Sequence, residues 1–486
     1  MLLGSILFNY ALGLRLSARP DTLRLGAGIA VNLGLLLWFK YAGVFIAIAA
    51  RLGFNSPVEE VMFPLAISFF TFRQISYLVD INNKMSPPPS FTDYLFEISF
   101  FPCLIAGPLI RHLEIAPQLK AGAPRPSWED FAVGSTLFTI GLVKKVILSE
   151  TMMVYSDKVF ESATYFDQIS FVTAWVGALA YGLQIYFDFS GYSDMAIGVA
   201  RIFGITLPLN FNSPYKSGSM VEFWQRWHMT LTRFFTTYLY NPIVMALTRR
   251  RARQGLGTSP RDLARPWPFL AITASTTMFI MTLMGVWHGN NALFAVFGAV
   301  HGLYLVVNRA WRIVHKAVFR VKSGALDAVG GVAGHALTLL AVTAAWGIFR
   351  AASPDAALRM MSGMAGLNGL YLPEGFGIRL GMLAEPFKAV GWRFGAPPDS
   401  HVYPTLTQLG QICALLGVTL FLPNSQEWLG RFAPALTFKE SSVPGWLRRV
   451  QWRPGALSGV TVAIVFVVSL VLIHVNRQTS FVYFQF

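Results

Sequence analysis

The sequence predicts an all-α polytopic membrane protein, a bundle of about 11 to 13 membrane segments that includes re-entrant and interfacial helices. Its 486 residues are 54% hydrophobic and only 13% charged, whereas a soluble globular chain carries about 25% charged residues. Apolar stretches also recur along the chain, several of them close to the roughly 20 residues that a helix needs to cross a bilayer. The sequence contains no long Pro/Ser linker, low-complexity tract or fixed-period repeat. We therefore expect residues 1–486 to form a single membrane domain.

The apolar stretches that approach spanning length are, in chain order, 25–50, 61–79, 131–147, 171–187, 269–287, 292–307, 336–349, 406–422 and 457–474. The predicted set is completed by more broken apolar segments at 2–14, 94–108, 197–209 and 232–247. Segment 2–14 lacks the basic n-region and small-residue cleavage pattern of a removed signal peptide, so we interpret it as a short membrane segment. Residues 360–400 are rich in Gly and Pro and contain several charges, which predicts an extramembrane or interfacial loop.

The positive charge of the chain follows the expected membrane topology. The formal net charge is +15, and the basic residues gather between apolar segments, as in the positive-inside pattern of cytoplasmic loops. Four such loops carry Arg15, Arg19 and Arg24; Arg249, Arg250, Arg251, Arg253, Arg261 and Arg265; Arg309, Arg312, Lys316, Arg320 and Lys322; and Arg448, Arg449 and Arg453. The lipid bilayer is thus an expected partner. A nucleic acid is not, because no aromatic-rich basic module accompanies the charge.

A histidine at the end of an apolar stretch is the strongest functional candidate. His288 directly follows an apolar run that begins near Trp267, and polar groups at membrane depth are costly, so they usually mark function. The basic loops on both sides should be cytoplasmic, so residues 269–307 are expected to enter the membrane and return as a hairpin. The Gly-Asn-Asn sequence at 289–291 supplies the turn chemistry. His288 then lies at the bend, far from the cytoplasmic ends.

A second histidine follows in the returning arm of this hairpin. His301 lies thirteen residues beyond His288, a separation of about 20 Å and about 220° on an uninterrupted helix. The two imidazoles therefore cannot share a helix face, and they meet only if the turn breaks the helix. Two interpretations of His301 stay open: a residue that supports catalysis, or a structural histidine with a hydrogen bond between helices.

The aromatic and basic segment 220–233 predicts a helix that lies at the membrane interface. Phe223, Trp227 and Leu231 recur at helical spacing and share one face, and Trp with Arg is typical of an interfacial helix. His228 is the residue that this interpretation leaves unexplained.

Two carboxylates, Asp188 and Asp194, interrupt an apolar stretch upstream. Buried carboxylates must be paired or neutral. They are candidates to orient a catalytic imidazole, to accept hydrogen bonds from substrate, or to cap helix ends. The sequence leaves these three roles open.

Several other kinds of site lack support in the sequence. Cys103 and Cys413 are the two cysteines and form no ligand motif, so no metal or redox site is predicted. The P-loop, H-E-x-x-H and G-x-S-x-G motifs are absent. This argues against an ATP-driven pump, a zincin-type protease and a nucleophile-elbow hydrolase.

Four motifs together resemble the membrane-bound O-acyltransferase (MBOAT) family, in its bacterial alginate O-acetylase-like branch. They are QIYFDFSGYSD at 184–194, LNFNSPY at 209–215, FWQRWH at 223–228, and GVWHG at 285–289 with VHG at 300–302. Weaker similarity occurs at 67–72, 100–108, 141–145 and 483–486, so the resemblance covers most of the chain. Branch members commonly carry Arg-Asp where this chain has Thr236-Thr237, and often one more apolar segment at the start. Substrate details and a truncated N-terminus therefore stay open.

The resemblance implies an MBOAT-like bundle in the bacterial cytoplasmic (inner) membrane with O-acetyltransferase activity. It implies that His288 is the catalytic histidine and His228 its second polar partner. The donor would be acetyl-CoA or another cytoplasmic thioester, which is a substrate rather than a bound cofactor. The acceptor would be an exported polysaccharide, acetylated directly or through an extracytoplasmic SGNH-type acetyltransferase partner.

Imidazole suits the chemistry that this function requires. O-Acylation needs a base that takes the proton of a hydroxyl as it attacks a thioester carbonyl, and a neutral imidazole can do so near neutral pH. We assign this role to His288. His228, together with Asn290 or Asn291, is expected to hydrogen-bond the substrate or the developing oxyanion. Trp287 is a further supporting candidate.

Donor binding has weaker candidates in Lys144, Lys145 and Arg226, which could steer the phosphates of an anionic donor. Snorkelling and membrane topology explain the lysines as well. A secondary transporter or flippase is the main alternative function, since membrane-embedded His and Asp also build proton relays. A non-catalytic scaffold of an acetylation complex is another. The acceptor stays open among alginate, cellulose, other exopolysaccharides, peptidoglycan and teichoic acid.

Overall fold

The computed structural model describes residues 1–53, 64, 66–120, 125–165, 168–318, 324–398, 402–438 and 443–476. The first half of the chain forms α1 (Leu2–Ala18), α2 (Thr22–Arg51), α3 (Ile67–Asn82), α4 (Phe91–Ser99), α5 (Phe101–Leu104), α6 (His112–Lys120), α7 (Trp128–Val143), the π-helix η1 (Lys144–Ser149), α8 (Glu150–Tyr165), α9 (Phe171–Ile202), the 3-10 helix η2 (Pro214–Lys216), α10 (Met220–Arg226), α11 (Met229–Phe235), the π-helix η3 (Thr236–Tyr240) and α12 (Asn241–Arg253).

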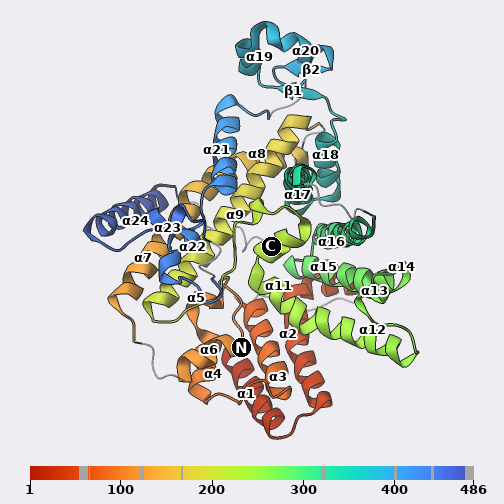
Figure 1. The fold of residues 1–486 in the computed structure, drawn as a ribbon, viewed down its shortest axis with the longest axis vertical. Coiled ribbons are helices and arrows are strands. Elements are labelled where there is room, and N and C mark those ends of the chain that lie inside the picture. Colours follow the sequence, from red (N-terminus) through yellow and green to blue (C-terminus); the bar gives the residue numbers. More distant parts are fainter. Residues whose placement is uncertain are drawn as a thin grey trace.

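The second half is also mostly helical (Figure 1). It forms α13 (Pro260–Leu263), α14 (Pro266–Pro268), the π-helix η4 (Phe269–Ala274), α15 (Ser275–His288), α16 (Ala292–Val318), α17 (Gly324–Arg350), α18 (Pro354–Met364), β1 (Leu370–Leu372), α19 (Glu374–Leu380), the 3-10 helix η5 (Gly381–Ala384), α20 (Glu385–Ala389), β2 (Trp392–Phe394), α21 (Leu406–Phe421), α22 (Ser425–Trp428), the 3-10 helix η6 (Gly430–Phe432), α23 (Leu447–Val450) and α24 (Ala456–Asn476).

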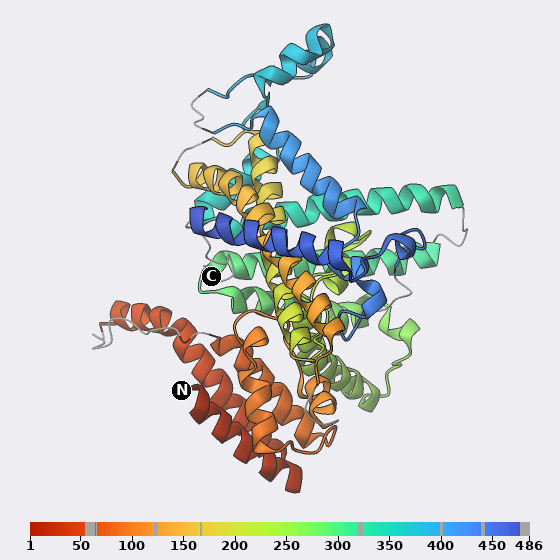
Figure 2. The ribbon, with the colours of Figure 1, turned by 90° about the vertical axis from the view of Figure 1, so that its left-hand side faces the viewer.

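The predicted all-α polytopic membrane fold is confirmed. Within the described residues, six helical stretches are long and apolar enough to cross a membrane: Thr22–Arg51, Trp128–Tyr165, Pro266–His288, Ala292–His315, Gly330–Arg350 and Ala456–Val475. Helices α1 and α21 are shorter apolar helices. Figure 2 shows α24 lying across α7, on which it packs.

Several of the broken segments predicted at 94–108, 197–209 and 232–247 do not form long helices. The first holds α4 and α5, the second the end of α9 and an extended stretch, and the third α11, η3 and part of α12. Most of residues 61–65 in the predicted segment 61–79 lie outside the described residues.

Helix α9 is the central column of the molecule. It is 32 residues long, and side chains all around it are buried. A helix with an apolar surface on every side is stable only inside a larger structure. Helices α7, α8, α17, α18 and α21 surround it, so α9 sets the position of everything that packs on it.

Helices α7 and α9 approach each other at two matched pairs of glycines. A Cβ atom placed on Gly134 would lie 2.5 Å from the carbonyl oxygen of Gly198, and one on Gly198 would lie 2.5 Å from that of Gly134. Seven residues along each helix, a Cβ atom on Gly191 would lie 2.6 Å from the carbonyl oxygen of Gly141. Small residues let backbones in membrane proteins come this close, and no larger side chain fits between these helices.

The predicted single interfacial helix over residues 220–233 is wrong. The structure divides it into α10 and α11 at His228, whose φ of 41° is left-handed. Phe223, Trp227 and Leu231 are buried in the core rather than placed at an interface. Helical spacing is preserved across the break, so the periodicity of the sequence does not reveal it.

Residues 360–400 contain ordered elements rather than a continuous loop. Their first residues end α18, and β1 pairs with β2 in a two-stranded parallel sheet beside α19 and α20. This unit projects from the end of the molecule opposite the α1–α3 bundle (Figure 1). Its predicted extramembrane or interfacial location stays a prediction.

The close glycine contact predicts an unusual response to alanine. In a helix, Gly→Ala normally stabilises by about 0.5–1 kcal/mol, but Gly198→Ala should destabilise the protein by about 1–3 kcal/mol because the new methyl group overlaps the α7 backbone. The measurement is the thermal unfolding midpoint in detergent. Gly26→Ala is the matched control, since a Cβ atom there meets nothing within 4 Å. Equal midpoints for both variants would contradict the tight α7–α9 contact.

Candidate active site

The predicted membrane hairpin is present, and His288 lies at its bend. His288 is the last residue of α15, and α16 begins at Ala292 after a three-residue turn. The half-buried imidazole lies in an aromatic wall, with its ring centre 5.0 Å from that of Trp287 and 5.1 Å from that of Phe349. Gly285, one turn earlier, lets α15 pack closely on the backbone of α16. The hairpin therefore holds His288 between two packed helices.

His228 lies at the break between α10 and α11. Its imidazole is 2% exposed and packs edge-on against Phe189 of α9, with 4.7 Å between ring centres. A left-handed backbone is uncommon for a residue other than glycine and costs conformational energy. Here it turns the chain so that the side chain points into the core instead of continuing the helix surface.

Asn210 determines which nitrogen of His228 carries the proton. Its Oδ1 lies 3.0 Å from His228 Nδ1 and also accepts a 2.8 Å hydrogen bond from the Thr230 hydroxyl. Its Nδ2 donates to Ser193 Oγ at 3.1 Å. Because Oδ1 can only accept, His228 Nδ1 must donate, which leaves Nε2 as the unprotonated nitrogen. Nε2 is buried and has no hydrogen-bond partner among the described residues.

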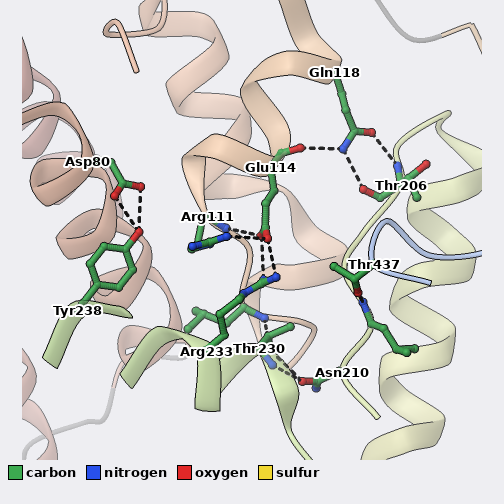
Figure 3. Close-up of polar contacts among 12 residues, drawn as sticks. Asp80, Arg111, Glu114, Gln118, Thr206, Asn210, Thr230, Arg233, Tyr238 and Thr437 are labelled. Carbon is green, nitrogen blue, oxygen red and sulfur yellow. Dashed lines mark hydrogen bonds and ion pairs between the residues drawn. The ribbon is translucent and has the colours of Figure 1, made fainter. Parts of the chain in front are cut away.

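The hydrogen bonds continue from Asn210 to the start of α6. The Thr230 hydroxyl accepts from the Leu109 backbone N–H at 2.9 Å, which leaves its own proton to donate to Asn210. Glu114 of α6 pairs with Arg233 of α11 at 2.7 Å. Figure 3 shows these contacts around α11. The helix that follows His228 is therefore held by α6 on one side and by Asn210 on the other.

A further contact holds the end of this region near α3. The Tyr238 hydroxyl donates to both oxygens of Asp80 at 2.9 Å (Figure 3). Burial raises the pKa of Asp80 to about 6, although the Tyr238 hydrogen bond acts in the opposite direction. This contact connects η3 to the N-terminal bundle.

The structure brings His228 and His288 together around Trp287. The Trp287 ring centre lies 6.5 Å from that of His228 and 5.0 Å from that of His288. Two motifs about 60 residues apart thus meet in one buried site.

His301 lies beside this site but in a separate layer. Its Nδ1 accepts a 3.3 Å hydrogen bond from Trp224 of α10. Phe297 packs on His301 with 4.5 Å between ring centres, and Phe349 packs between Phe297 and His288. The structure thus shows the interhelix hydrogen bond predicted for His301. A direct catalytic role for it stays untested.

The two carboxylates of α9 form buried ion pairs. Asp188 pairs with Lys145 at 2.6 Å, and Asp194 with Lys144 at 2.6 Å. Both carboxylates lie well inside α9, so of the three roles left open they do not cap the ends of their own helix. The lysines follow α7 directly, and the close α7–α9 packing brings them opposite the carboxylates. Their predicted role in donor binding stays untested.

The remaining predicted side chains have local partners. Arg226 pairs with Glu222 at 2.8 Å and donates to the Asn212 carbonyl. Asn291 accepts from the Leu293 backbone N–H at 3.0 Å, which secures the start of α16. Asn290 lies exposed in the turn. Among the described residues, His228 therefore forms no hydrogen bond with Arg226 or with either asparagine.

Sequence reasoning missed two residues that the structure brings to the site. Asn210 lies in the LNFNSPY motif at 209–215, but the sequence did not indicate a role for it. Lys40 lies in the middle of the apolar stretch 25–50, where it is the single charged residue. Its ammonium donates to the Trp287 carbonyl. An ionisable residue inside a membrane segment is the signal that could have identified it.

A cavity approaches the site between α10, α11, η3, α15 and α16. It has a volume of about 300 Å³. Its lining on α15 extends from Thr277 to Met284, one turn before His288. Arg309 lines it as well and donates to Thr277 Oγ1 at 3.0 Å and to the Tyr240 hydroxyl at 2.8 Å. One part of the cavity is therefore cationic and another is lined by methionines.

Comparisons with known proteins show which family the chain resembles. The model of the MBOAT, membrane-bound O-acyltransferase family matches residues 36–258. The peptidoglycan O-acetyltransferase of Helicobacter pylori is 35% identical over 405 residues, which cover 76% of this chain and 71% of that protein. The "Probable alginate O-acetylase AlgI" of Pseudomonas aeruginosa is 30% identical over 509 residues, covering 99% of this chain and 90% of that protein.

A more distant relative is named for a different cell-wall polymer, teichoic acid. The teichoic acid D-alanyltransferase of Bacillus subtilis is 25% identical over 253 residues, which cover 52% of this chain and 60% of that protein. The two nearer relatives are at least 30% identical and are matched over more than two thirds of their length. The chain therefore belongs to the membrane-bound O-acyltransferase family and is an O-acyltransferase.

Proposed function

We propose that the protein transfers an acetyl group from a cytoplasmic thioester, acetyl-CoA, to a sugar hydroxyl of an exported polysaccharide. The observation that carries this proposal is that His288 and His228 lie on either side of Trp287 inside a membrane fold. Asn210 fixes the tautomer of His228. The names of the two nearer relatives, an alginate O-acetylase and a peptidoglycan O-acetyltransferase, support a carbohydrate hydroxyl as the acceptor. The expected location is the bacterial inner membrane.

In the proposed reaction, His288 acts as the general base. It takes the proton from the acceptor hydroxyl as the oxygen attacks the thioester carbonyl. A new C–O bond forms, the C–S bond breaks, and the proton passes to the departing thiolate to give free CoA. The products are an acetate ester and a thiol, so no oxidant, metal or other co-reactant is needed.

His228 is suited to orient the acceptor hydroxyl. Its Nε2 is a hydrogen-bond acceptor while Nδ1 donates to Asn210, so in this tautomer it does not donate to an oxyanion. We therefore replace the expected oxyanion role of His228 with a hydrogen bond from a neighbouring hydroxyl of the acceptor sugar, because the proton of the attacking hydroxyl passes to His288. Holding the nucleophile in position lowers the entropic barrier of the transfer.

The cavity beside α15 is the proposed route of the donor. Arg309 lies in the C-terminal half of α16, which we expect to face the cytoplasm. Its guanidinium group is suited to bind the phosphates of CoA there. Met284 lies four residues before His288, so the two share one face of α15. A thioester that enters along this face reaches the imidazole from the cytoplasmic side. Lys144 and Lys145 take no part in this route.

An exported acceptor requires that the acetyl group reach the opposite side of the membrane. We propose that the bend of the α15–α16 hairpin is the point of transfer, because it lies opposite the basic loops. Transfer to the polysaccharide is either direct or relayed through an extracytoplasmic SGNH-type acetyltransferase. Addition of candidate acceptors and of such a partner to the same assay separates these two forms.

The central test is transfer of radiolabelled acetyl from acetyl-CoA in proteoliposomes. His288→Ala should lower the rate by about 100-fold or more, because general base catalysis contributes about 10²–10⁴-fold, while the protein keeps its elution volume and unfolding midpoint. His315→Ala is a matched control at an exposed position of α16. Equal rates for wild type and His288→Ala would remove His288 as the base. Absence of transfer with every acceptor would favour transport or a scaffold.

A second test concerns the tautomer of His228. Asn210→Leu should reduce kcat by about tenfold or more, the equivalent of one lost hydrogen bond, because Nδ1 loses its acceptor. Asn210→Asp keeps that acceptor and should retain more activity. Ser193→Ala is the control, since it removes the acceptor of Asn210 Nδ2 and leaves the contacts of Oδ1 with His228 and Thr230 in place. The same loss in all three variants would indicate a packing defect rather than control of the tautomer.

A further inference from the structure

Lys40 occupies a position where a membrane helix normally carries an apolar residue. It lies in α2, which is long and apolar enough to span the membrane, about 27 Å along the helix from Thr22. A charged residue at such depth is costly and usually faces a functional site. The side chain is half-buried, so it does not simply face lipid.

The ammonium group binds the free end of α15. The last carbonyl groups of a helix have no partner within the helix, and a cation at this end is favourable for the helix dipole. Lys40 donates to the carbonyl of Trp287, and the Tyr41 hydroxyl donates to the carbonyl of Val286 at 2.5 Å. Two neighbouring residues of α2 thus cap the final turn of a helix 247 and 245 residues away.

The capped turn is the one that carries His288. The Lys40 Nζ lies 5.4 Å from the centre of the ring of Trp287, the residue directly before His288. Beyond His288 the backbone is extended at Gly289, so α15 provides no further turn to hold the imidazole. The Gly289 backbone N–H donates to the Val286 carbonyl, and the side chains of Lys40 and Tyr41 add contacts from outside the helix that hold its end.

We propose that Lys40 is a positioning residue of the acyl-transfer site, which holds the last turn of α15 and thereby orients the His288 imidazole. This inference rests on the proposed role of His288 as the base. Lys40 belongs to the N-terminal bundle, whereas the rest of the site is built by α9–α11 and α15–α17. Displacement of a catalytic group by about 1 Å costs about 100-fold in rate, so a loose end of α15 should be visible in kcat.

The test replaces the ammonium chemically in the folded protein. In a Cys413→Ser background, Lys40→Cys should lower kcat for acetyl transfer by about 100-fold with little change in the KM for acetyl-CoA. Treatment with 2-aminoethyl methanethiosulfonate attaches an ammonium group to the cysteine and should restore most of the rate. Methyl methanethiosulfonate attaches a neutral group through the same kind of disulfide bond and should not restore the rate. Arg51→Cys, which removes a cation from the exposed end of α2, should keep the wild-type rate throughout.

A second readout does not depend on acetyl transfer. Diethyl pyrocarbonate modifies accessible imidazoles, and the rate at His288 can be followed by mass spectrometry, with exposed His315 as the internal reference. Loss of the Lys40 ammonium should increase the rate at His288 alone, and the aminoethyl reagent should reverse the increase. A purely packing role would respond equally to both reagents.

The outcomes separate this inference from the proposed function. A wild-type rate and unchanged His288 modification in Lys40→Cys, or equal rescue by the neutral reagent, would overturn the role of Lys40. If the wild type itself transferred no acetyl group, the proposed function would fail, and the modification rates would still decide whether Lys40 positions His288.

Discussion

Helices α7 and α9 lie so close at their paired glycines that the backbone of each occupies the space where a side chain of the other would be. The rest of the structure depends on this contact because α9 is the column on which α8, α17, α18 and α21 pack. It also sets one wall of the site, since α9 contributes Phe189 beneath His228 and Ser193 beside Asn210. A shift of α9 would therefore move the support of His228 as well as the core.

The same contact makes the buried charges possible. Charges removed from water are costly unless they are paired in good geometry. Lys144 and Lys145 follow α7 at the height of Asp194 and Asp188, and each forms an ion pair at 2.6 Å. Asp194 accepts further hydrogen bonds from Ser425 and Gln426 of α22. These pairs connect the C-terminal part of the chain to the central helix.

Within this scaffold, the site is built from places where helices stop. His228 lies at the break between α10 and α11, and His288 at the end of α15. Helix ends expose polar backbone groups, which are costly in an apolar environment unless other groups bind them. Asn210 accepts from the backbone N–H groups of Met229 and Thr230 at the first end, and Lys40 and Tyr41 donate to backbone carbonyls at the second. Contacts that satisfy the backbone thus also orient the two imidazoles that we propose for catalysis.

The sequence by itself determined the membrane class, most of the long helices and the hairpin with His288 at its bend, because apolar length, basic loops and turn residues are local properties. It also indicated His228 through its motif. The break at His228 was decided by tertiary structure, because Phe223, Trp227 and Leu231 keep helical spacing across a left-handed residue. Tertiary structure also decided two contacts between residues that are distant in the chain. Asp188 pairs with Lys145, and Lys40 contacts Trp287. Local patterns describe which residues a helix buries, whereas the partner of a buried polar group depends on which helices the fold brings together.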